Sequence, residues 1–181
     1  MSKLEYPLVW IDCEMTGLDL KVDTILEICI LLTDKDLNVV SETLELVINH
    51  SDSVLENMND WCKVHHKESG LVDKVKNSTI SLKAAEAQIL NFLKPFVKQG
   101  ERLVIAGNSV HVDKQFIEKD FPLVNELLHY RVVDVSTIKE LCKRWSTQVF
   151  NDVPMKKLNH RAKDDILESI DELNKFIFSF D

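Results

Sequence analysis

The sequence predicts an α/β fold, a sheet layered with helices, because strand-like and helix-like segments alternate along the chain. Two apolar runs rich in β-forming residues, 8–15 and 24–33, are typical of buried strands. Two long segments, 81–97 and 161–178, carry apolar residues at intervals of three and four, as amphipathic helices do. With 181 residues and neither a linker nor a repeat, the chain is expected to form one domain, residues 1–181.

Shorter segments complete this alternation. Segment 40–48 alternates apolar and polar side chains, which indicates a half-exposed strand. Two more short strands are expected at 102–106 and 131–135, and further helices at 53–64, 111–119 and 137–146. Ser136 is placed to cap the last of these helices. In the final helix the expected core face consists of Ala162, Ile166, Ile170, Leu173 and Ile177.

The overall charge limits the kinds of nucleic acid that the protein can bind. The formal net charge is −8, whereas proteins that grip long nucleic acids usually carry a basic stripe along the binding surface. The sequence shows no such stripe. Either the protein does not bind nucleic acid, or it binds a short piece in a small pocket that is locally positive.

Hydropathy and cysteine usage bear on the cellular location. The apolar run 28–32 is far too short to span a membrane, and segment 1–7 lacks the patterns of a secretory signal and of a transit peptide. We therefore expect a cytoplasmic protein without a membrane partner, with a mitochondrial form left open. The four cysteines form no C-x-x-C pair, so we expect reduced and mostly buried thiols.

Two carboxylates interrupt the apolar strand at 8–15. Asp12 and Glu14 are two residues apart, so both side chains project from the same face of the strand. Buried side by side they would repel each other, and a divalent cation such as Mg²⁺ or Mn²⁺ would remove that repulsion. A strand edge with its acidic face in water is the ordinary alternative. The apolar neighbours Trp10, Ile11 and Cys13 favour burial and therefore a metal site.

A third carboxylate follows the short strand at 102–106. Asp113 comes after a Gly-Asn-Ser sequence, in the first turn of the helix expected at 111–119. Functional residues collect at strand ends in α/β sheets. An aspartate in the first turn of a helix can also serve only to stabilise the helix dipole. Asp113 taken alone leaves both interpretations open.

The last helix supplies a fourth carboxylate and follows a histidine. Asp164 lines up with other charged residues on a solvated face, whereas Asp165 lies beside the apolar stripe and is expected to point inward. His160 lies five residues before Asp165, and on an ideal helix the two side chains would point about 140° apart. They can share a site only if His160 lies in the loop or in an irregular first turn. A histidine in a polar loop is otherwise an ordinary surface residue.

Together these residues resemble the DEDD exonuclease superfamily. Asp12 and Glu14 form its acid-x-acid pattern on a strand, Asp113 follows about 100 residues later, and H-x-A-x-x-D at 160–165 is typical of the DEDDh subgroup. Val112 is a departure, since bacterial members commonly carry Gln there, and no loss of chemistry is expected from it. Four blocks resemble the oligoribonuclease family more closely still: WIDCEMTGLD (10–19), GNSVHVD (107–113), YRVVDVSTIKELCKRW (130–145) and NHRAKDDILESI (159–170).

The resemblance implies a fold and a mechanism. The fold would be the ribonuclease H-like exonuclease fold, a central mixed sheet flanked by helices. The acids Asp12, Glu14, Asp113 and Asp165 would hold two divalent cations, Mg²⁺ or Mn²⁺, one activating a water and the other stabilising the leaving 3′ oxygen. His160 would be the general base. The reaction would be 3′-to-5′ hydrolysis of very short RNA, especially 5′-phosphorylated dinucleotides, to nucleoside monophosphates.

The resemblance also implies how short substrates are selected. Leu18 would wedge against the 3′ base and Trp61 would stack on a base, although a core aromatic is an equally ordinary interpretation of Trp61. Tyr130 would reach in from the other subunit of a homodimer. A cap over the 5′ end would limit the partner to single-stranded RNA of two to about five nucleotides, which needs no basic track. The residues expected to hold the 5′ phosphate are His66, Ser109, Arg131 and Ser136, and the planar fork of Arg131 suits phosphate oxygens.

Two other functions stay open. A DEDD exonuclease acting on longer RNA or DNA would carry more exposed Lys and Arg along a groove and no 5′ cap, and the presence of Tyr130, Arg131 and Ser109 argues against it. A binding module that keeps the fold without the chemistry usually lacks an acid or the histidine, and none is missing here. Chelation would leave the affinity of a binding module unchanged, but it would stop turnover by a nuclease.

Overall fold

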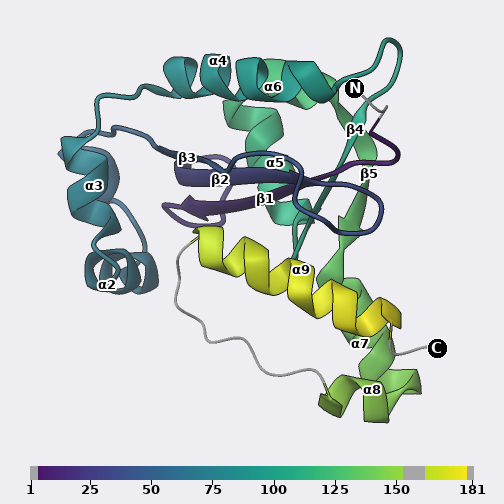
Figure 1. The fold of residues 1–181 in the computed structure, drawn as a ribbon. Coiled ribbons are helices and arrows are strands. Elements are labelled where there is room, and N and C mark those ends of the chain that lie inside the picture. Colours follow the sequence, from purple (N-terminus) through teal and green to yellow (C-terminus); the bar gives the residue numbers. More distant parts are fainter. Residues whose placement is uncertain (1–3, 153–161, 179–181) are drawn as a thin grey trace.

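A five-stranded mixed sheet forms the centre of the computed structural model, which describes residues 4–152 and 162–178 (Figure 1). The strand order is β3-β2-β1-β4-β5. β1 and β3 pair antiparallel with β2, whereas β4 runs parallel to both β1 and β5. This confirms the predicted α/β class and mixed sheet. The strands are β1 (Leu8–Met15), β2 (Ile25–Thr33), β3 (Leu44–Val47), β4 (Leu103–Gly107) and β5 (Leu128–Asp134).

Three helices cover one face of the sheet (Figure 1): α4 (Leu82–Leu93), α5 (His111–Asp120) and α6 (Pro122–Leu127). The alternate β1 side chains, Ile11 among them, point into this layer and pack with Phe116 of α5. Burial of these apolar side chains is the main force that holds the layer to the sheet. It also fixes the position of the first turn of α5, where Asp113 lies.

Two helices cover the opposite face, α7 (Val135–Trp145) and α9 (Ala162–Phe178) (Figure 1). Trp10 packs on this side with Ile166 and other apolar side chains of α9, and it is fully buried. Because side chains alternate along a strand, Asp12 and Glu14 project from the same face as Trp10. The packing of α9 therefore decides what the two carboxylates meet.

A third group of helices packs against β2. α1 (Asp52–Glu56), α2 (Asp60–Glu68) and α3 (Leu71–Asn77) bury five apolar side chains around Leu26. The sequence predicted one helix at 53–64, and it is divided because the side chain of Asn59 caps α2, accepting the Cys62 N–H at 2.8 Å. The side chains concerned are Leu55, Met58, Cys62, Leu71 and Val75.

The boundaries differ from prediction at several helix ends. The 3₁₀ turn η1 (Lys94–Phe96) continues α4, and α6 and α8 (Thr147–Asp152) follow no pattern recognised in the sequence. The expectation that Ser136 caps α7 was wrong, because the Asp134 side chain is the cap and accepts the Ser136 N–H at 3.0 Å.

Two expectations from hydropathy and cysteine usage can be checked directly. None of the described helices is long and apolar enough to cross a membrane. All four cysteines are buried and free, as predicted.

Gly107 allows the end of β4 to lie very close to β1. A Cβ at this position would be 2.8 Å from the Ile11 carbonyl oxygen, well inside van der Waals contact. Only a residue without a side chain permits this approach. The chain then turns directly into α5, which brings Asp113 back to β1.

Helix α9 offers a matched pair for testing the core. The sequence places both Leu173 and Ile177 on its apolar face, but Leu173 is 3% exposed and Ile177 is 47% exposed, while Phe176 is fully buried instead. We expect Leu173→Ala to lower the free energy of unfolding by about 2–5 kcal/mol, and Ile177→Ala by less than about 1 kcal/mol. Urea denaturation followed by circular dichroism measures both losses. Equal losses would contradict the packing of α9 described here.

Candidate functional site

Three carboxylates from opposite ends of the chain converge on the α9 face of the sheet. Asp12 and Glu14 project from β1, and Asp165 comes from the first turn of α9. One oxygen from each lies within 4.8 Å of the others. Asp164 is exposed and Asp165 is half-buried, which matches the orientations expected from their spacing along the helix.

A fourth carboxylate approaches β1 from the end of β4. Asp113 is 7% exposed, and its Oδ1 accepts the backbone N–H of Cys13 at 2.9 Å. The β4 ladder reaches only Trp10 on this side of β1, so a side chain rather than a strand satisfies that N–H. Asp113 therefore does more than stabilise the dipole of α5, because it accepts a hydrogen bond from Cys13, the residue between Asp12 and Glu14.

The electrostatics of the site disfavour ionised carboxyls. Burial, followed by the neighbouring carboxylates Glu27, Asp165 and Asp113, raises the pKa of Glu14 to about 7. Burial also raises the pKa of Asp113 to about 7, although hydrogen bonds from the backbone, including that of Cys13, act to lower it. Burial and the adjacent acids raise the pKa of the Cys13 thiol well above its usual value. The site concentrates negative charge that only a cation or protons can relieve.

These residues fit a divalent metal ion. The donors of Asp12, Glu14 and Asp165 are carboxylate oxygens, the type that Mg²⁺ and Mn²⁺ prefer. Oxygens bound to one such ion at about 2.0–2.6 Å lie at most about 4–5 Å apart, which the 4.8 Å separation already approaches. Asp113 stands beside this set with one oxygen held by Cys13.

Of the two histidines predicted for the site, the structure describes His66. Its ring is buried on α2, with Nε2 at 2.8 Å from the Met15 carbonyl oxygen and Nδ1 at 3.8 Å from Glu14. The ring therefore lies against the acidic cluster, which the sequence did not suggest. His160 lies outside the described residues.

Two exposed apolar side chains belong to segments that adjoin the cluster. Leu18 is 73% exposed in the loop after β1, and Asp23 holds that loop by accepting the Thr16 hydroxyl and the Asp19 N–H, each at 2.8 Å. Trp61 on α2 is 57% exposed and stacks on the His65 ring at 3.9 Å between centroids. Trp61 is therefore a surface aromatic, and the alternative of a core residue is wrong.

The serines predicted for the 5′ end come together at the ends of β4 and β5. The Ser109 N–H donates to Asp134 Oδ1 at 2.9 Å and to Ser136 Oγ at 3.1 Å. Asp134 Oδ2 lies 3.2 Å from His111 Nδ1. These side chains line a hollow of about 410 Å³, whose walls are Ser109, His111, Asp134, Ser136, Thr137, Glu140, Leu141 and Arg144.

Sequence reasoning missed Asp134, His111 and Arg144 as parts of this hollow. An aspartate between a strand and a helix is a recognisable capping signal, so Asp134 could have been found. Arg144 forms an ion pair with Glu140 one helical turn away. Nothing local in the sequence distinguishes it, or the exposed His111, from an ordinary surface residue.

Tyr130 and Arg131 lie on the edge strand β5. Tyr130 is 72% exposed, and the Arg131 guanidinium lies 5.3 Å from the centroid of its ring. A large exposed aromatic on an edge strand is a typical contact for a second chain. The arrangement keeps both side chains on the surface.

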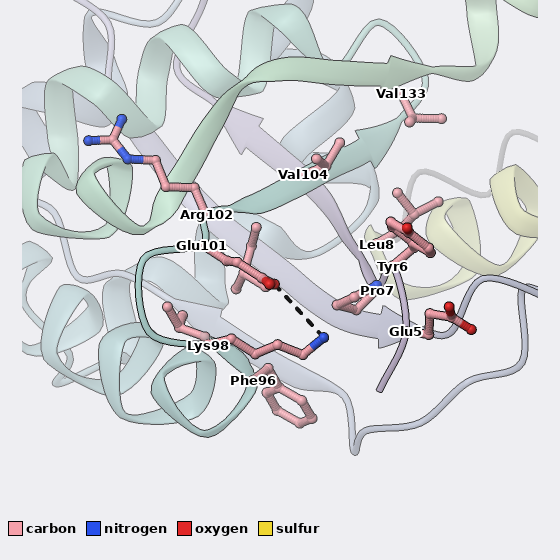
Figure 2. Close-up of a pocket in the computed structure, with 12 residues that line it drawn as sticks. Glu5, Tyr6, Pro7, Leu8, Phe96, Lys98, Glu101, Arg102, Val104 and Val133 are labelled. Atoms are coloured by element: carbon pink, nitrogen blue, oxygen red, sulfur yellow. Dashed lines mark ion pairs between the residues drawn. The ribbon is translucent and has the colours of Figure 1, made fainter. Parts of the chain in front are cut away.

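A second hollow, of about 630 Å³, lies at the opposite end of β1 (Figure 2). It is bounded by Tyr6, Leu8, Phe96 and Val104, and Lys98 on its rim pairs with Glu101 at 3.8 Å. Asp12, Glu14 and Asp165 lie toward the other end of the strand. This hollow therefore belongs to a separate part of the surface.

Comparison with known proteins places the chain in a family. The exonuclease family model RNase_T matches residues 9–173. Mouse mitochondrial oligoribonuclease is 49% identical over 166 residues, which is 92% of this chain and 70% of that protein. A probable oligoribonuclease of Dictyostelium discoideum is 50% identical over 93% of this chain and 87% of its own length. Oligoribonuclease of Mycobacterium tuberculosis is 48% identical over 92% of this chain and 77% of its own length.

Solved structures support the fold independently. Exonuclease I superposes with a TM-score of 0.72 at 15% identity, over 97% of this chain and 43% of that protein. E. coli exonuclease I in complex with a dT13 oligonucleotide gives the same score over 94% of this chain. At this identity the likeness establishes the ribonuclease H-like exonuclease fold alone, and the chain spans less than half of exonuclease I. With nearly half of its residues shared with oligoribonucleases along most of their length, the chain belongs to the oligoribonuclease family of exonucleases.

Proposed function

We propose that residues 1–181 form one exonuclease domain that hydrolyses very short RNA from its 3′ end and releases nucleoside monophosphates. The preferred substrates are 5′-phosphorylated dinucleotides. The observation that carries the proposal is the convergence of Asp12, Glu14 and Asp165 within 4.8 Å, with Leu18 exposed in the loop after β1. The names of the similar proteins support short RNA as the substrate class.

The four acids Asp12, Glu14, Asp113 and Asp165 would hold two divalent cations, Mg²⁺ or Mn²⁺. When bound, such ions activate a water and stabilise the oxygen that leaves. The carboxylates would hold the ions, and the raised pKa of Glu14, caused by burial and by neighbouring carboxylates, suits a site that binds positive charge. His160 would take the proton of the attacking water.

The exposed side chains on one side of the cluster would bind the bases. Trp61 is 57% exposed on α2, and stacking of a base on an exposed aromatic side chain is worth about 1–3 kcal/mol. Leu18 would wedge against the 3′ base. Both contacts tolerate any base, because each recognises its shape and π-face rather than its hydrogen-bonding edge.

The 5′ phosphate would be held at the hollow between β4 and β5. Ser109 and Ser136 line it, and Arg131 would reach it with a planar fork suited to phosphate oxygens. His66 would also contact the substrate; its buried ring lies 3.8 Å from Glu14, beside the acidic cluster. Closing the 5′ end in this way would exclude longer RNA. It also suits the net charge of −8, since a two-nucleotide ligand needs only the metal ions and one or two cations.

A homodimer would complete the site. Tyr130 is 72% exposed, and we propose that it contacts the 5′ end bound to the other subunit. A two-fold arrangement would place each Tyr130 at the partner's site. A cytoplasmic location stays a prediction, because the similar proteins include both mitochondrial and bacterial ones.

Activity is expected to depend strictly on Mg²⁺ or Mn²⁺. Asp12→Ala should abolish turnover, because it removes a ligand from the cluster, whereas Asp164→Ala, in the exposed neighbour of Asp165, should leave turnover unchanged. Hydrolysis of a 5′-labelled dinucleotide, with and without EDTA, measures both. Undiminished hydrolysis in excess EDTA would contradict the metal assignment.

The metal-free protein should also lose stability as the pH rises. The pKa of Glu14 increases from 4.5 to about 7 on folding, and that of Asp113 from 3.8 to about 7. Between these values the folded state holds protons that the unfolded chain has released, so the free energy of unfolding falls from about pH 4 to 7. Glu14→Gln should raise the metal-free Tm at pH 8 by roughly 2–8 °C and reduce the increase produced by Mg²⁺. A lower Tm for this variant would contradict the repulsion.

Substrate length and the 5′ phosphate should be recognised together. Among RNAs of two to seven nucleotides, kcat/KM should be highest for the 5′-phosphorylated dinucleotide. Arg131→Ala should weaken its binding roughly ten- to a hundredfold, since loss of a charge-assisted contact costs about 1.5–3 kcal/mol. A dinucleotide without the 5′ phosphate should bind weakly to the wild type, and Arg131→Ala should reduce its affinity little further.

The same comparison separates the proposal from an exonuclease that acts on longer strands. Such an enzyme would show no preference for the shortest RNA and no response to a phosphate one residue from the cut. Equal weakening of both dinucleotides by Arg131→Ala, or none, would refute selection by the 5′ phosphate even if the nuclease assignment stands.

Mixing two impaired variants tests whether the subunits of a dimer share their sites. Light scattering should give a mass near twice 20.9 kDa. Tyr130→Ala should be weakly active alone, and Asp12→Ala should be inactive. The two variants are unfolded and refolded together, so that about half of the dimers are mixed. Each mixed dimer would contain one intact acidic cluster facing one intact Tyr130, which is one active site of two. The mixture should therefore recover about a quarter of wild-type activity. No restoration, or a fully active monomer, would refute a shared site.

A further inference from the structure

A continuous chain of hydrogen bonds links helix α9 to the serines at the ends of β4 and β5. The Ser169 hydroxyl donates to the Asp165 carbonyl oxygen at 2.6 Å, and the Asn108 amide donates to Ser169 Oγ at 2.8 Å. The Ser136 hydroxyl donates to Asn108 Oδ1 at 3.1 Å. Asn108 is therefore the side chain in this chain of bonds that contacts both Ser169 of α9 and Ser136 at the start of α7.

The orientation of the Asn108 amide is set by its neighbours. Ser169 is buried and already gives its one proton to Asp165, so its oxygen can only accept from Asn108. Glu172, 4% exposed, also accepts from the Asn108 NH₂ group at 3.3 Å and is paired with Lys139 at 2.7 Å. The amide oxygen must then face Ser136. Reversing the amide would set its oxygen against two acceptors.

On its other side Asn108 controls the geometry of both serines. Ser136 Oγ, held by Asn108, accepts the Ser109 N–H, which Asp134 Oδ1 also accepts. Ser109 has a φ of 51°, in the left-handed region that is unfavourable for any residue with a side chain. Such a conformation persists only where the surroundings hold it, and Ser136 and Asp134 do so here.

We propose that Asn108 is a positioning residue that fixes the distance and orientation of the 5′-phosphate site relative to the acidic cluster. The inference rests on the proposed function and deepens it, since Asn108 touches neither phosphate nor metal. Its amide joins the turn before α5, the start of α7 and the helix that carries Asp165. Selection of a dinucleotide requires the two ends of the site to be held at a fixed separation. A linked frame of hydrogen bonds, part-buried between α9 and Ser136, supplies that rigidity.

The test compares two substrates on the same folded protein. The ratio of kcat/KM for a 5′-phosphorylated dinucleotide to that for its unphosphorylated counterpart reports the 5′ site alone. We expect Asn108→Ala to lower this ratio at least about tenfold, through KM for the phosphorylated substrate. Asn125→Ala is the matched control, because Asn125 is also half-buried and bonded through its side chain, to Lys114 at 3.2 Å on α5. It should leave the ratio unchanged.

Ser169→Ala provides a second variant if Asn108→Ala does not fold. It removes one oxygen, which belongs to neither serine of the proposed 5′ site, and breaks the connection between Asn108 and Asp165. A drop in the ratio in the same direction supports the frame, and combining the two substitutions should lower the ratio no further than Asn108→Ala alone.

The outcomes separate this inference from the proposed function. If the wild type prefers the phosphorylated dinucleotide and both Asn108→Ala and Ser169→Ala keep that preference, the positioning role is wrong and the proposed function stands. If the wild type shows no preference, the 5′ site itself is wrong and the inference falls with it.

Discussion

The packing of α9 across β1 is the contact on which the rest of the site depends. Apolar side chains of α9, Ile166 and Ile170 among them, bury Trp10 and bring Asp165 within 4.8 Å of carboxylates that precede it by about 150 residues. Burial of that apolar surface must outweigh the desolvation of Glu14 and its repulsion by neighbouring carboxylates, which together raise its pKa. The helix thus holds three carboxylates together that repel one another. A bound cation would relieve that repulsion, which favours cation binding.

The sequence predicted those parts of the structure that follow from short-range periodicity. Strand alternation placed Asp12 and Glu14 on one face, and helical spacing distinguished Asp165 from Asp164. Helical spacing did not predict which apolar residue at the end of α9 is buried. Ile177 is exposed, whereas its neighbour Phe176 is buried. Residues within a turn of each other look equivalent in sequence, and only the position of the sheet separates them.

The polar part of the site was harder to foresee for a different reason. Asn108 contacts residues 28 to 64 positions away, and no spacing rule reports such a partner. His66 lies beside Glu14, a contact that no spacing in the sequence indicated. Side chains with several possible partners take their role from the assembled fold.

The order of the elements along the chain has a consequence for synthesis of the protein. All five strands precede α9, so a chain still emerging from the ribosome can build its sheet before the last acid of the cluster is available. Until α9 docks, one face of that sheet is incompletely covered and the metal-binding set is incomplete. If the four acids hold the catalytic cations as proposed, a ribonuclease made in this order would be inactive beside the messenger RNA and ribosome that produce it. Activity would appear only after residues 162–178 have left the exit tunnel and packed.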